Sequence, residues 1–261
     1  MAEAADLAVV TGAARGIGAA VATGLAAQAW SLLLIDACAA QPGIGYEMPA
    51  RADLDALASR CAEAGAPSVE LLQADVGGGD FAASLARALE GRTATAAVAA
   101  AGVIAGGPGW DTSEDAWASL MNVNLHGTRR LAEATIPGMV QAGRGRFVAI
   151  ASAAALRAMP QLAAYSAAKA ATVGYVRALA GDLAGTGVSA NAICPGSTRG
   201  VMLAASAEVY DLTGEEEFVS QHLIRRLIEP REIAEAVVWL CGPAAAALTG
   251  AVLPVDGGLT A

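Results

Sequence analysis

The chain has few of the residues that metal sites and disulfide frameworks require. It contains four cysteines, none in a CxxC pair, and only two histidines, His126 and His222, in 261 residues. A zinc site built from these side chains is poorly supported. Isolated cysteines favour reduced thiols, which are typical of the cytoplasm.

Basic residues are also scarce. Sixteen Lys and Arg against 25 Asp and Glu give a net charge of −9, and such a surface repels phosphate backbones. The apolar runs are interrupted before they could span a bilayer, and the acidic start MAEAADLAVV lacks the basic stretch of a signal peptide. These features predict a cytoplasmic protein that binds neither nucleic acid nor membrane.

Small and apolar residues dominate what is present. The chain is 55% hydrophobic, and its length suits one large domain over residues 1–261. Several short apolar runs have no polar alternation, as in strands buried on both faces of a parallel sheet, and helical stretches separate them. This pattern predicts a Rossmann-type α/β fold, a doubly wound parallel sheet with helices on both faces in three layers. The expected strands are 7–11, 32–35, 69–74, 96–100, 146–151, 188–193 and 251–255.

Helix boundaries have local signals. Thr112–Asp115 offers a cap for a long helix that reaches about Gln141, and Thr213–Glu216 reads as a capping box ahead of a short helix. Pro230 suits the first turn of a helix over 231–240 that ends at Gly242.

Two stretches are longer than a compact domain needs for its connections. Residues 38–50 follow the second expected strand and contain two prolines and two glycines. Residues 197–212 follow a Pro-Gly pair, within a region 197–225 expected to face the substrate. Each is either a lid over a bound molecule or a passive surface insertion.

A glycine-rich turn, TGAARGIG, follows the first strand and opens a helix. Glycines there let the backbone approach a pyrophosphate, and the helix N-terminus presents free N–H groups to it. The turn predicts a dinucleotide site. Its expected nucleotide-binding residues are Gly12, Ala14, Arg15, Gly16, Ile17 and Gly18.

Asp36 ends the second strand, where a Rossmann unit places an acid for the adenosine ribose. A carboxylate would repel a 2′-phosphate, so NAD is preferred to NADP, although the Arg15 guanidinium could serve that phosphate. Asp36 could instead be a solvated loop acid. Asp75, followed by Val76, could bind the adenine amino group or cap a helix.

Tyr165 and Lys169 stand four residues apart in YSAAK, on one face of an expected helix. A free phenol has a pKa near ~10, and we expect the ammonium and a positively charged nicotinamide to lower it. Ser152 could hold the reacting oxygen, and Asn124 in VNLHG could anchor a proton-relay water. Taken singly, these four could be a core tyrosine, a solvated lysine, a strand-end cap and a helix-bending amide.

Together these motifs resemble the short-chain dehydrogenase/reductase family in its compact form. The resemblance rests on TGAARGIG, Asp75-Val76, VNLHG, Ser152, YSAAK, Pro195-Gly196 and the closing VDGG. It implies a seven-stranded sheet, a homotetramer and a catalytic tetrad of Asn124, Ser152, Tyr165 and Lys169. It also implies further cofactor contacts at Ala100, Ala101, Gly102, Tyr165, Lys169, Pro195, Gly196 and Thr198.

A narrower resemblance is to the mycofactocin-associated members of that family. It rests on YEMPARADLDAL, VAAAGVIAGG and PGSTRGVML followed by LIRRLIEP. Those members resemble nicotinoproteins, which retain NAD(H) and pass electrons to a peptide-derived carrier, mycofactocin. The insertion 38–50 would then cover the adenosine half of the cofactor.

The chain departs from the family pattern at two places. Ala99-Ala100-Ala101-Gly102 replaces the usual Asn-Asn-Ala-Gly, which removes side-chain amides that brace the strand. Gly200 stands where a threonine usually binds the carboxamide, and Thr198 or Ser197 could substitute.

The sequence therefore predicts an oxidoreductase that moves a hydride between NAD(H) and an alcohol or ketone, with Tyr165 as general acid/base. The alternatives are an NADPH-dependent carbonyl or 3-oxoacyl reductase, a non-catalytic NAD-binding sensor or scaffold, and an epimerase or dehydratase. Three loops, 103–111, 153–162 and 197–212, should line the substrate pocket. Their apolar content predicts an apolar substrate and consists of Ile104, Trp110, Leu156, Met159, Met202 and Leu203.

Overall fold

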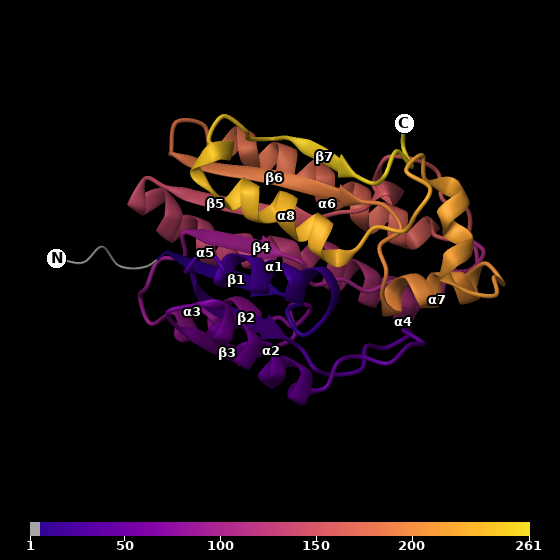
Figure 1. Ribbon diagram of the computed structural model, residues 1–261, viewed down its shortest axis with the longest axis horizontal. Helices are drawn as coiled ribbons and strands as arrows, with labels where there is room; N and C mark the ends of the chain where they lie inside the picture. Colours follow the sequence, from indigo (N-terminus) through magenta and orange to yellow (C-terminus); the bar gives the residue numbers. More distant parts are fainter. Residues whose placement is uncertain (1–5) are drawn as a thin grey trace.

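The computed structural model describes residues 6–261. The first five residues, part of the N-terminal stretch expected to lack a signal peptide, lie outside it. A seven-stranded parallel sheet in the order β3-β2-β1-β4-β5-β6-β7 forms the centre of the described part (Figure 1). All seven expected strands are present, with ends that move by at most two residues. The strands are β1 (Leu7–Thr11), β2 (Ser31–Asp36), β3 (Val69–Gln73), β4 (Ala96–Ala99), β5 (Gly145–Ile150), β6 (Val188–Pro195) and β7 (Val252–Val255).

Helices cover both faces of this sheet, as the sequence predicts. The α-helices are α1 (Gly16–Ala26), α2 (Arg51–Ala64), α3 (Phe81–Leu89), α4 (Glu114–Leu120), α5 (Gly127–Ala142), α6 (Ala163–Asp182), α7 (Val201–Val209) and α8 (Pro230–Cys241). A π-helical turn, η1 (Met121–His126), joins α4 to α5. Three 3₁₀ turns, η2 (Ala153–Ala155), η3 (Glu215–Gln221) and η4 (Pro243–Ala245), complete the set.

Two hydrophobic cores lie on the two faces. Helices α1, α2 and α8 pack on one, and α3, α5 and α6 pack on the other. Strand β2 shows why its sequence has no polar alternation: Leu32 and Leu34 enter the first core, while Leu33 and Ile35 enter the second. Side chains of a strand alternate between faces, so a strand covered on both sides needs apolar residues throughout.

The helix signals are mostly confirmed. The Ser113 hydroxyl accepts a hydrogen bond from the Ala116 N–H at 3.2 Å and caps α4. Pro230 occupies the first turn of α8, and Gly242 ends it. The long helix predicted over 114–141 is instead interrupted by η1, because its hydrogen bonds locally widen to the π pattern.

The capping box predicted for Thr213–Glu216 is wrong, because the acidic residue that bonds Thr213 is Glu217 and not Glu216. The Glu217 carboxylate accepts from both the Thr213 N–H, at 2.6 Å, and the Thr213 hydroxyl, at 2.7 Å. Glu216 instead pairs with Arg199. The segment that follows is the 3₁₀ turn η3, whose tighter geometry places a different carboxylate over the N-terminus.

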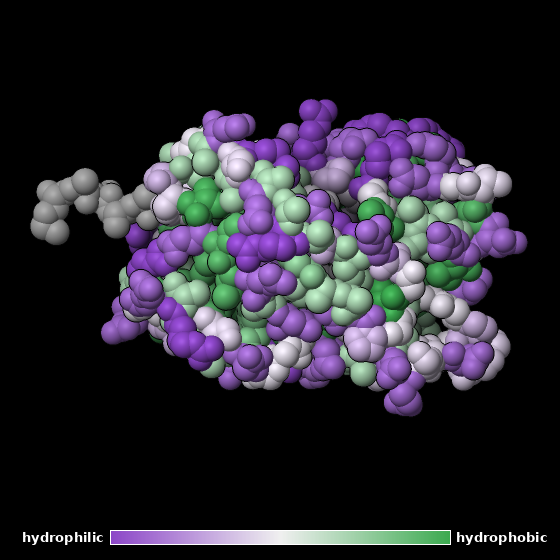
Figure 2. Space-filling view, turned by 90° about the horizontal axis from the view of Figure 1, so that it is seen from below, coloured by the Kyte–Doolittle hydropathy of each residue, from purple (hydrophilic) through white to green (hydrophobic). Residues whose placement is uncertain are grey.

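The direction of winding reverses between β1 and β4, which lie side by side in the sheet. Ligands of doubly wound sheets bind at the carboxyl ends of the strands beside such a reversal. In Figure 1 that edge lies at the right, together with α7 and the loop after β2. The face seen from below carries apolar residues scattered among polar ones (Figure 2). Within residues 6–261, no helix combines the length and apolar character that crossing a membrane requires.

Candidate active site

A cavity of about 620 Å³ opens at the carboxyl edge of the sheet. Its wall is formed by the glycine-rich turn, the segments that follow β2 to β6, and the start of α7. Most of the predicted site residues line it. These are Gly12, Arg15, Gly16, Ile17, Gly18, Asp36, Asp75, Val76, Ala100, Ala101, Gly102, Ser152, Tyr165, Lys169, Pro195, Gly196 and Thr198. Ala14 and Asn124 are absent from this wall and lie behind it.

The glycine-rich turn leaves room for a close approach of backbone. Gly12 has a φ of +65°, and a Cβ there would lie 2.5 Å from the Ala101 Cα. A Cβ on Gly18 would overlap the Gly12 carbonyl oxygen. A side chain at Gly12 would therefore push this turn away from the segment after β4. Around Gly16, by contrast, a Cβ would meet no atom within 4 Å, which leaves the N-terminus of α1 open to the cavity.

Asp36 ends β2, as predicted, and holds the surrounding backbone. One carboxylate oxygen accepts from the Ala14 N–H at 3.1 Å and the other from the Cys38 N–H at 3.0 Å. These bonds fix the carboxylate at the cavity wall between the glycine-rich turn and the insertion. Asp36 thus lines the cavity wall with both carboxylate oxygens bonded to backbone, and its contact with an adenosine ribose stays a prediction.

Arg15 faces the insertion 38–50. Its guanidinium donates to the Glu47 carbonyl at 2.6 Å, contacts the Met48 sulfur at 3.5 Å and lies 5.7 Å from the centre of the Tyr46 ring. The sequence left open a role for Arg15 at a 2′-phosphate. In the structure its donors are directed to the insertion.

Asp75 lies two residues beyond β3. One carboxylate oxygen accepts from the Gly77 N–H at 2.7 Å, and the other accepts from the Gln41 amide at 3.2 Å. Helix α3 begins only at Phe81 with Asp80 as its cap, so the alternative role of Asp75 as a helix cap is wrong.

The insertion 38–50 crosses the carboxyl edge and is fastened to separate elements. Besides the bonds to Asp75 and Arg15, the Ser119 hydroxyl on α4 donates to the Pro42 carbonyl at 2.7 Å. The Tyr46 hydroxyl accepts from the Ile104 N–H at 3.1 Å. Residues of the insertion and its end also line the cavity: Ala39, Gln41, Met48 and Pro49. The insertion is therefore part of the cavity wall and not a passive surface loop.

Tyr165 and Lys169 are both buried on α6, with the Lys169 Nζ 5.8 Å from the centre of the Tyr165 ring. The ammonium donates to the Ile150 carbonyl at the end of β5 at 2.8 Å. Residue spacing alone predicted this juxtaposition, because positions i and i+4 share a helix face.

The polypeptide alone does not lower the pKa of Tyr165. Burial raises the pKa of Tyr165 to about 12, although the Ser152 hydroxyl acts to lower it. Burial also lowers the pKa of Lys169 to about 8. Desolvation disfavours the charged forms of both groups. A lowered Tyr165 pKa therefore requires positive charge from outside the polypeptide.

Asn124 lies in η1 and uses its side-chain amide within the protein. The amide nitrogen donates to the carbonyls of Val103, at 2.9 Å, and Leu120, at 3.0 Å, and the amide oxygen accepts from the Val103 N–H at 3.2 Å. Asn124 thus braces the segment after β4 against the helix. Its predicted part in a proton relay stays a prediction.

Ser152 lies two residues beyond β5, where the sequence placed it at the end of the strand. Its hydroxyl accepts from the Ala154 N–H at 3.1 Å and caps η2. Ser152 also faces the cavity beside Tyr165, so it combines the capping role that the sequence left as an alternative with a place at the site.

The sequence departs from the family pattern at Ala99-Ala100 and at Gly200, and a nearby threonine makes hydrogen bonds at each place. The Thr11 hydroxyl donates to the Val98 carbonyl at 3.4 Å and accepts from the Ala101 N–H at 3.3 Å, which ties β1 to the segment after β4. Thr198 lines the cavity and donates to the Gly196 carbonyl at 3.0 Å. The Thr11 bonds were not predicted. Thr198 is one of the two residues expected to substitute at Gly200, and its contact with a carboxamide stays a prediction.

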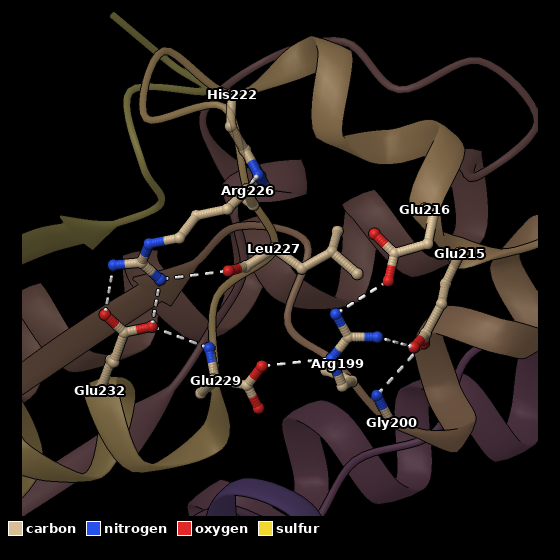
Figure 3. A network of polar contacts seen from close by, with 9 residues as sticks. All are labelled: Arg199, Gly200, Glu215, Glu216, His222, Arg226, Leu227, Glu229 and Glu232. Atoms are coloured by element: carbon tan, nitrogen blue, oxygen red, sulfur yellow. Dashed lines mark hydrogen bonds and ion pairs between the residues drawn. The ribbon is translucent and has the colours of Figure 1, made fainter.

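Sequence reasoning also missed an ion-pair cluster on the substrate side (Figure 3). Arg199 pairs with Glu215 at 2.7 Å, Glu216 at 2.8 Å and Glu229 at 3.1 Å. The cluster joins the start of α7 to η3 and to the start of α8. No local motif signals it, since its members lie up to 30 residues apart.

His222 is buried and cannot serve as a general base in this arrangement. Its Nε2 accepts from the Ser197 N–H at 3.2 Å, and its Nδ1 lies 2.8 Å from the Arg226 carbonyl. Since a carbonyl needs a donor and an N–H needs an acceptor, these contacts fix the neutral tautomer with the proton on Nδ1.

The substrate end of the cavity is partly as predicted. The cavity is lined there by Ile104, Met159, Met202 and Leu203. The prediction is wrong for Trp110, which is 92% exposed, and for Leu156, which is also exposed. Apolar loop residues face either a pocket or the surface, and spacing does not distinguish the two. The structure adds residues that the sequence analysis did not select: Arg157, Tyr210, Phe218, Gln221 and Leu259.

Comparison with known proteins finds oxidoreductases among the relatives of this chain. The chain is 37% identical over 163 residues to 2-(S)-hydroxypropyl-CoM dehydrogenase 3 of Xanthobacter autotrophicus, a match that covers 62% of this chain and 64% of that protein, less than two thirds of its length. It is 33% identical over 261 residues to an uncharacterized NAD-dependent oxidoreductase of Mycobacterium tuberculosis, covering 97% of this chain and 94% of the relative.

The fold and the family are likewise shown. The crystal structure of carveol dehydrogenase from Mycobacterium avium in complex with NAD superimposes with a TM-score of 0.91 at 26% identity and covers 98% of both chains. A family model described as enoyl-(acyl carrier protein) reductase matches residues 12–260. With its sheet order, glycine-rich turn and YSAAK helix, the chain belongs to the short-chain dehydrogenase/reductase family.

Proposed function

We propose that this protein is an NAD-dependent dehydrogenase that oxidises an apolar alcohol, or reduces the corresponding ketone. The main observation behind this proposal is that Tyr165, Lys169 and Ser152 face the same cavity as the glycine-rich turn. A nucleotide-binding sensor needs the turn and gains nothing from a buried tyrosine and lysine beside it.

The cavity fits a dinucleotide by its shape. The close backbone packing at Gly12 and Gly18 and the open N-terminus of α1 suit a pyrophosphate, and the Asp36 carboxylate lies at the wall where an adenosine ribose would lie. When bound, NAD supplies the hydride acceptor. The residues that would hold it are the predicted cofactor set that lines the cavity.

The remaining chemistry belongs to the chain. Ser152 and Tyr165 bind the substrate hydroxyl, and the Tyr165 phenol exchanges the proton with it. Lys169, held by the Ile150 carbonyl, places a positive charge beside that phenol and would hold the nicotinamide ribose. Asn124 holds the segment after β4 in position and supports the water that carries the proton away.

NAD is favoured over NADP because of Asp36 and Arg15 together. The carboxylate would repel a 2′-phosphate, and the Arg15 guanidinium, which could attract that phosphate, donates instead to the Glu47 backbone carbonyl. The relative with an NAD-dependent description and the NAD-bound structure support the same choice.

Replacing Asp36 by asparagine should weaken NAD binding by about tenfold and narrow the preference over NADP. The change keeps the shape of the side chain and removes the charge that strengthens hydrogen bonds to the ribose. Titration of both nucleotides by calorimetry measures the two affinities. Asp55→Asn, on the exposed side of α2, is the matched control. An unchanged ratio of affinities would refute this role for Asp36.

The cofactor is further proposed to stay bound, with mycofactocin as the electron acceptor. The support is the insertion, which is fastened at several points over the nucleotide end of the cavity. A homotetramer is proposed as well. Apolar side chains are exposed on the helices that the family uses for its interfaces: Trp117 on α4, Val140 on α5 and Trp239 on α8.

Extensively desalted protein should therefore release about one NAD or NADH per chain when it is denatured, as judged by mass spectrometry. Assays would then use artificial electron acceptors with a panel of apolar alcohols. Protein that retains no nucleotide would point to an ordinary exchanging dehydrogenase. Retained NADP would instead favour the reductase alternative and contradict the role of Asp36.

A further inference from the structure

We infer that Tyr46, in the insertion, is a positioning residue for the catalytic wall of the cavity. The wall in question is the peptide 102–104, which follows β4 and faces the cavity along its whole length. The insertion would then act on the chemistry as well as on cofactor retention. The catalytic part of this inference rests on the proposed dehydrogenase function.

The peptide 102–104 is held from the helix side by Asn124. The Asn124 amide bonds both the N–H and the carbonyl of Val103. The same amide lies next to Gly102, where a Cβ would be 3.0 Å from the Asn124 Oδ1 and 3.4 Å from the Lys169 Nζ. Movement of this peptide would therefore change the surroundings of the Lys169 ammonium.

Tyr46 holds the same peptide from the opposite end. Its hydroxyl accepts the Ile104 N–H at 3.1 Å, and this is the only bond recorded for that N–H among the described residues. The Tyr46 ring packs against the core that contains Tyr165, and the Arg15 guanidinium lies over the ring at 5.7 Å. The peptide is thus clamped between η1 and the insertion.

Tyr46 is also electrostatically close to the catalytic phenol. After burial and the Ser152 hydroxyl, Tyr46 is among the groups that act on the pKa of Tyr165. Burial raises the pKa of Tyr46 itself, which keeps its hydroxyl protonated and neutral at physiological pH. A neutral phenol can accept the Ile104 N–H without adding a negative charge beside Tyr165.

A second hydroxyl offers a matched control, because it fastens the insertion without touching this peptide. Ser119 on α4 donates to the Pro42 carbonyl at 2.7 Å. Tyr46→Phe and Ser119→Ala each remove one hydroxyl that anchors the insertion. Only Tyr46→Phe frees the Ile104 N–H.

The two variants are compared with the wild type by hydrogen–deuterium exchange of peptides that contain Ile104, by nucleotide content, and by kcat and KM with an artificial acceptor. Tyr46→Phe should speed exchange at 102–104 about fivefold, the loss expected for one buried hydrogen bond. It should lower kcat about five- to tenfold while the nucleotide content and KM stay near those of the wild type. Ser119→Ala should leave exchange at 102–104 and kcat at their wild-type values.

Exchange that is unchanged in Tyr46→Phe would overturn the clamp. A kcat that is unchanged in Tyr46→Phe, or lowered equally in Ser119→Ala, would overturn the positioning role and reduce Tyr46 to an anchor. If the wild type oxidises no alcohol in the panel, the proposed function fails. The exchange data still decide whether Tyr46 holds the peptide.

Discussion

Replacing Tyr165 by phenylalanine should lower turnover by about 10³-fold or more, within the range that general acid/base catalysis provides. The substitution removes the phenol oxygen and keeps the ring, which packs from α6 into the hydrophobic core. Nucleotide binding should remain, because the glycine-rich turn and Asp36 are untouched. Steady-state kinetics and nucleotide content measured on the same sample separate the two effects.

Tyr175→Phe is the matched control for this change. Tyr175 lies on the same helix and is half-buried, but it does not line the cavity. It should keep nearly full activity. Turnover retained by Tyr165→Phe would remove the phenol from the mechanism.

The pH profile provides a second readout of the same residue. Burial raises the pKa of Tyr165 to about 12, so the basic form needed for alcohol oxidation becomes more populated as the pH rises. Oxidation by the wild type should therefore accelerate with increasing pH, and ketone reduction should not. This rise should disappear in Tyr165→Phe.

Shortening the insertion should raise the dissociation rate of NAD(H) by about 1,000-fold, because four hydrogen bonds are lost and each contributes about 1 kcal/mol. The change replaces residues 39–49 with a Gly–Ser linker too short to reach α4. It removes the bonds of the insertion to Asp75, Ser119, Ile104 and Arg15. Release of NADH can be followed by the loss of its fluorescence after dilution into excess NAD.

A Gly–Ser linker of the original length is the control for this deletion. It keeps the reach of the chain and loses the bonds of the Gln41 and Tyr46 side chains, while its backbone carbonyls can still accept from Ser119 and Arg15. Fast release from both variants would assign retention to the anchoring side chains of the insertion. Fast release from the short variant alone would assign retention to the covering of the cofactor by the loop. Full retention by the shortened variant would show that the insertion is not a lid.

Local patterns predicted the features that depend on neighbouring residues in the chain. The sheet followed from runs such as 32–35, because a strand covered on both faces needs apolar residues throughout. Tyr165 and Lys169 met because their spacing matches one helical turn. The position of Asp36 was predicted because it is the last residue of a strand, paired with Gln73 of β3 at the carboxyl edge of the sheet.

Features that depend on contacts between distant segments were missed. Arg199 meets its three carboxylates only after α7, η3 and α8 have packed together. The anchors of the insertion join residues from 32 to 77 positions apart. Sequence spacing reports the ammonium near Tyr165 but not the depth of burial, which raises the pKa of this residue in the polypeptide alone.

The two-sided packing of β2 also limits how this chain could have changed in length. Adding or deleting one residue within 31–36 would exchange Leu32 and Leu34 with Leu33 and Ile35 and place each pair in the wrong core. Immediately after Asp36 the same polypeptide accommodates a long insertion, because a loop imposes no such alternation. Evolution could thus add new parts to this cavity at the tips of the strands, while the strands themselves had to keep their length.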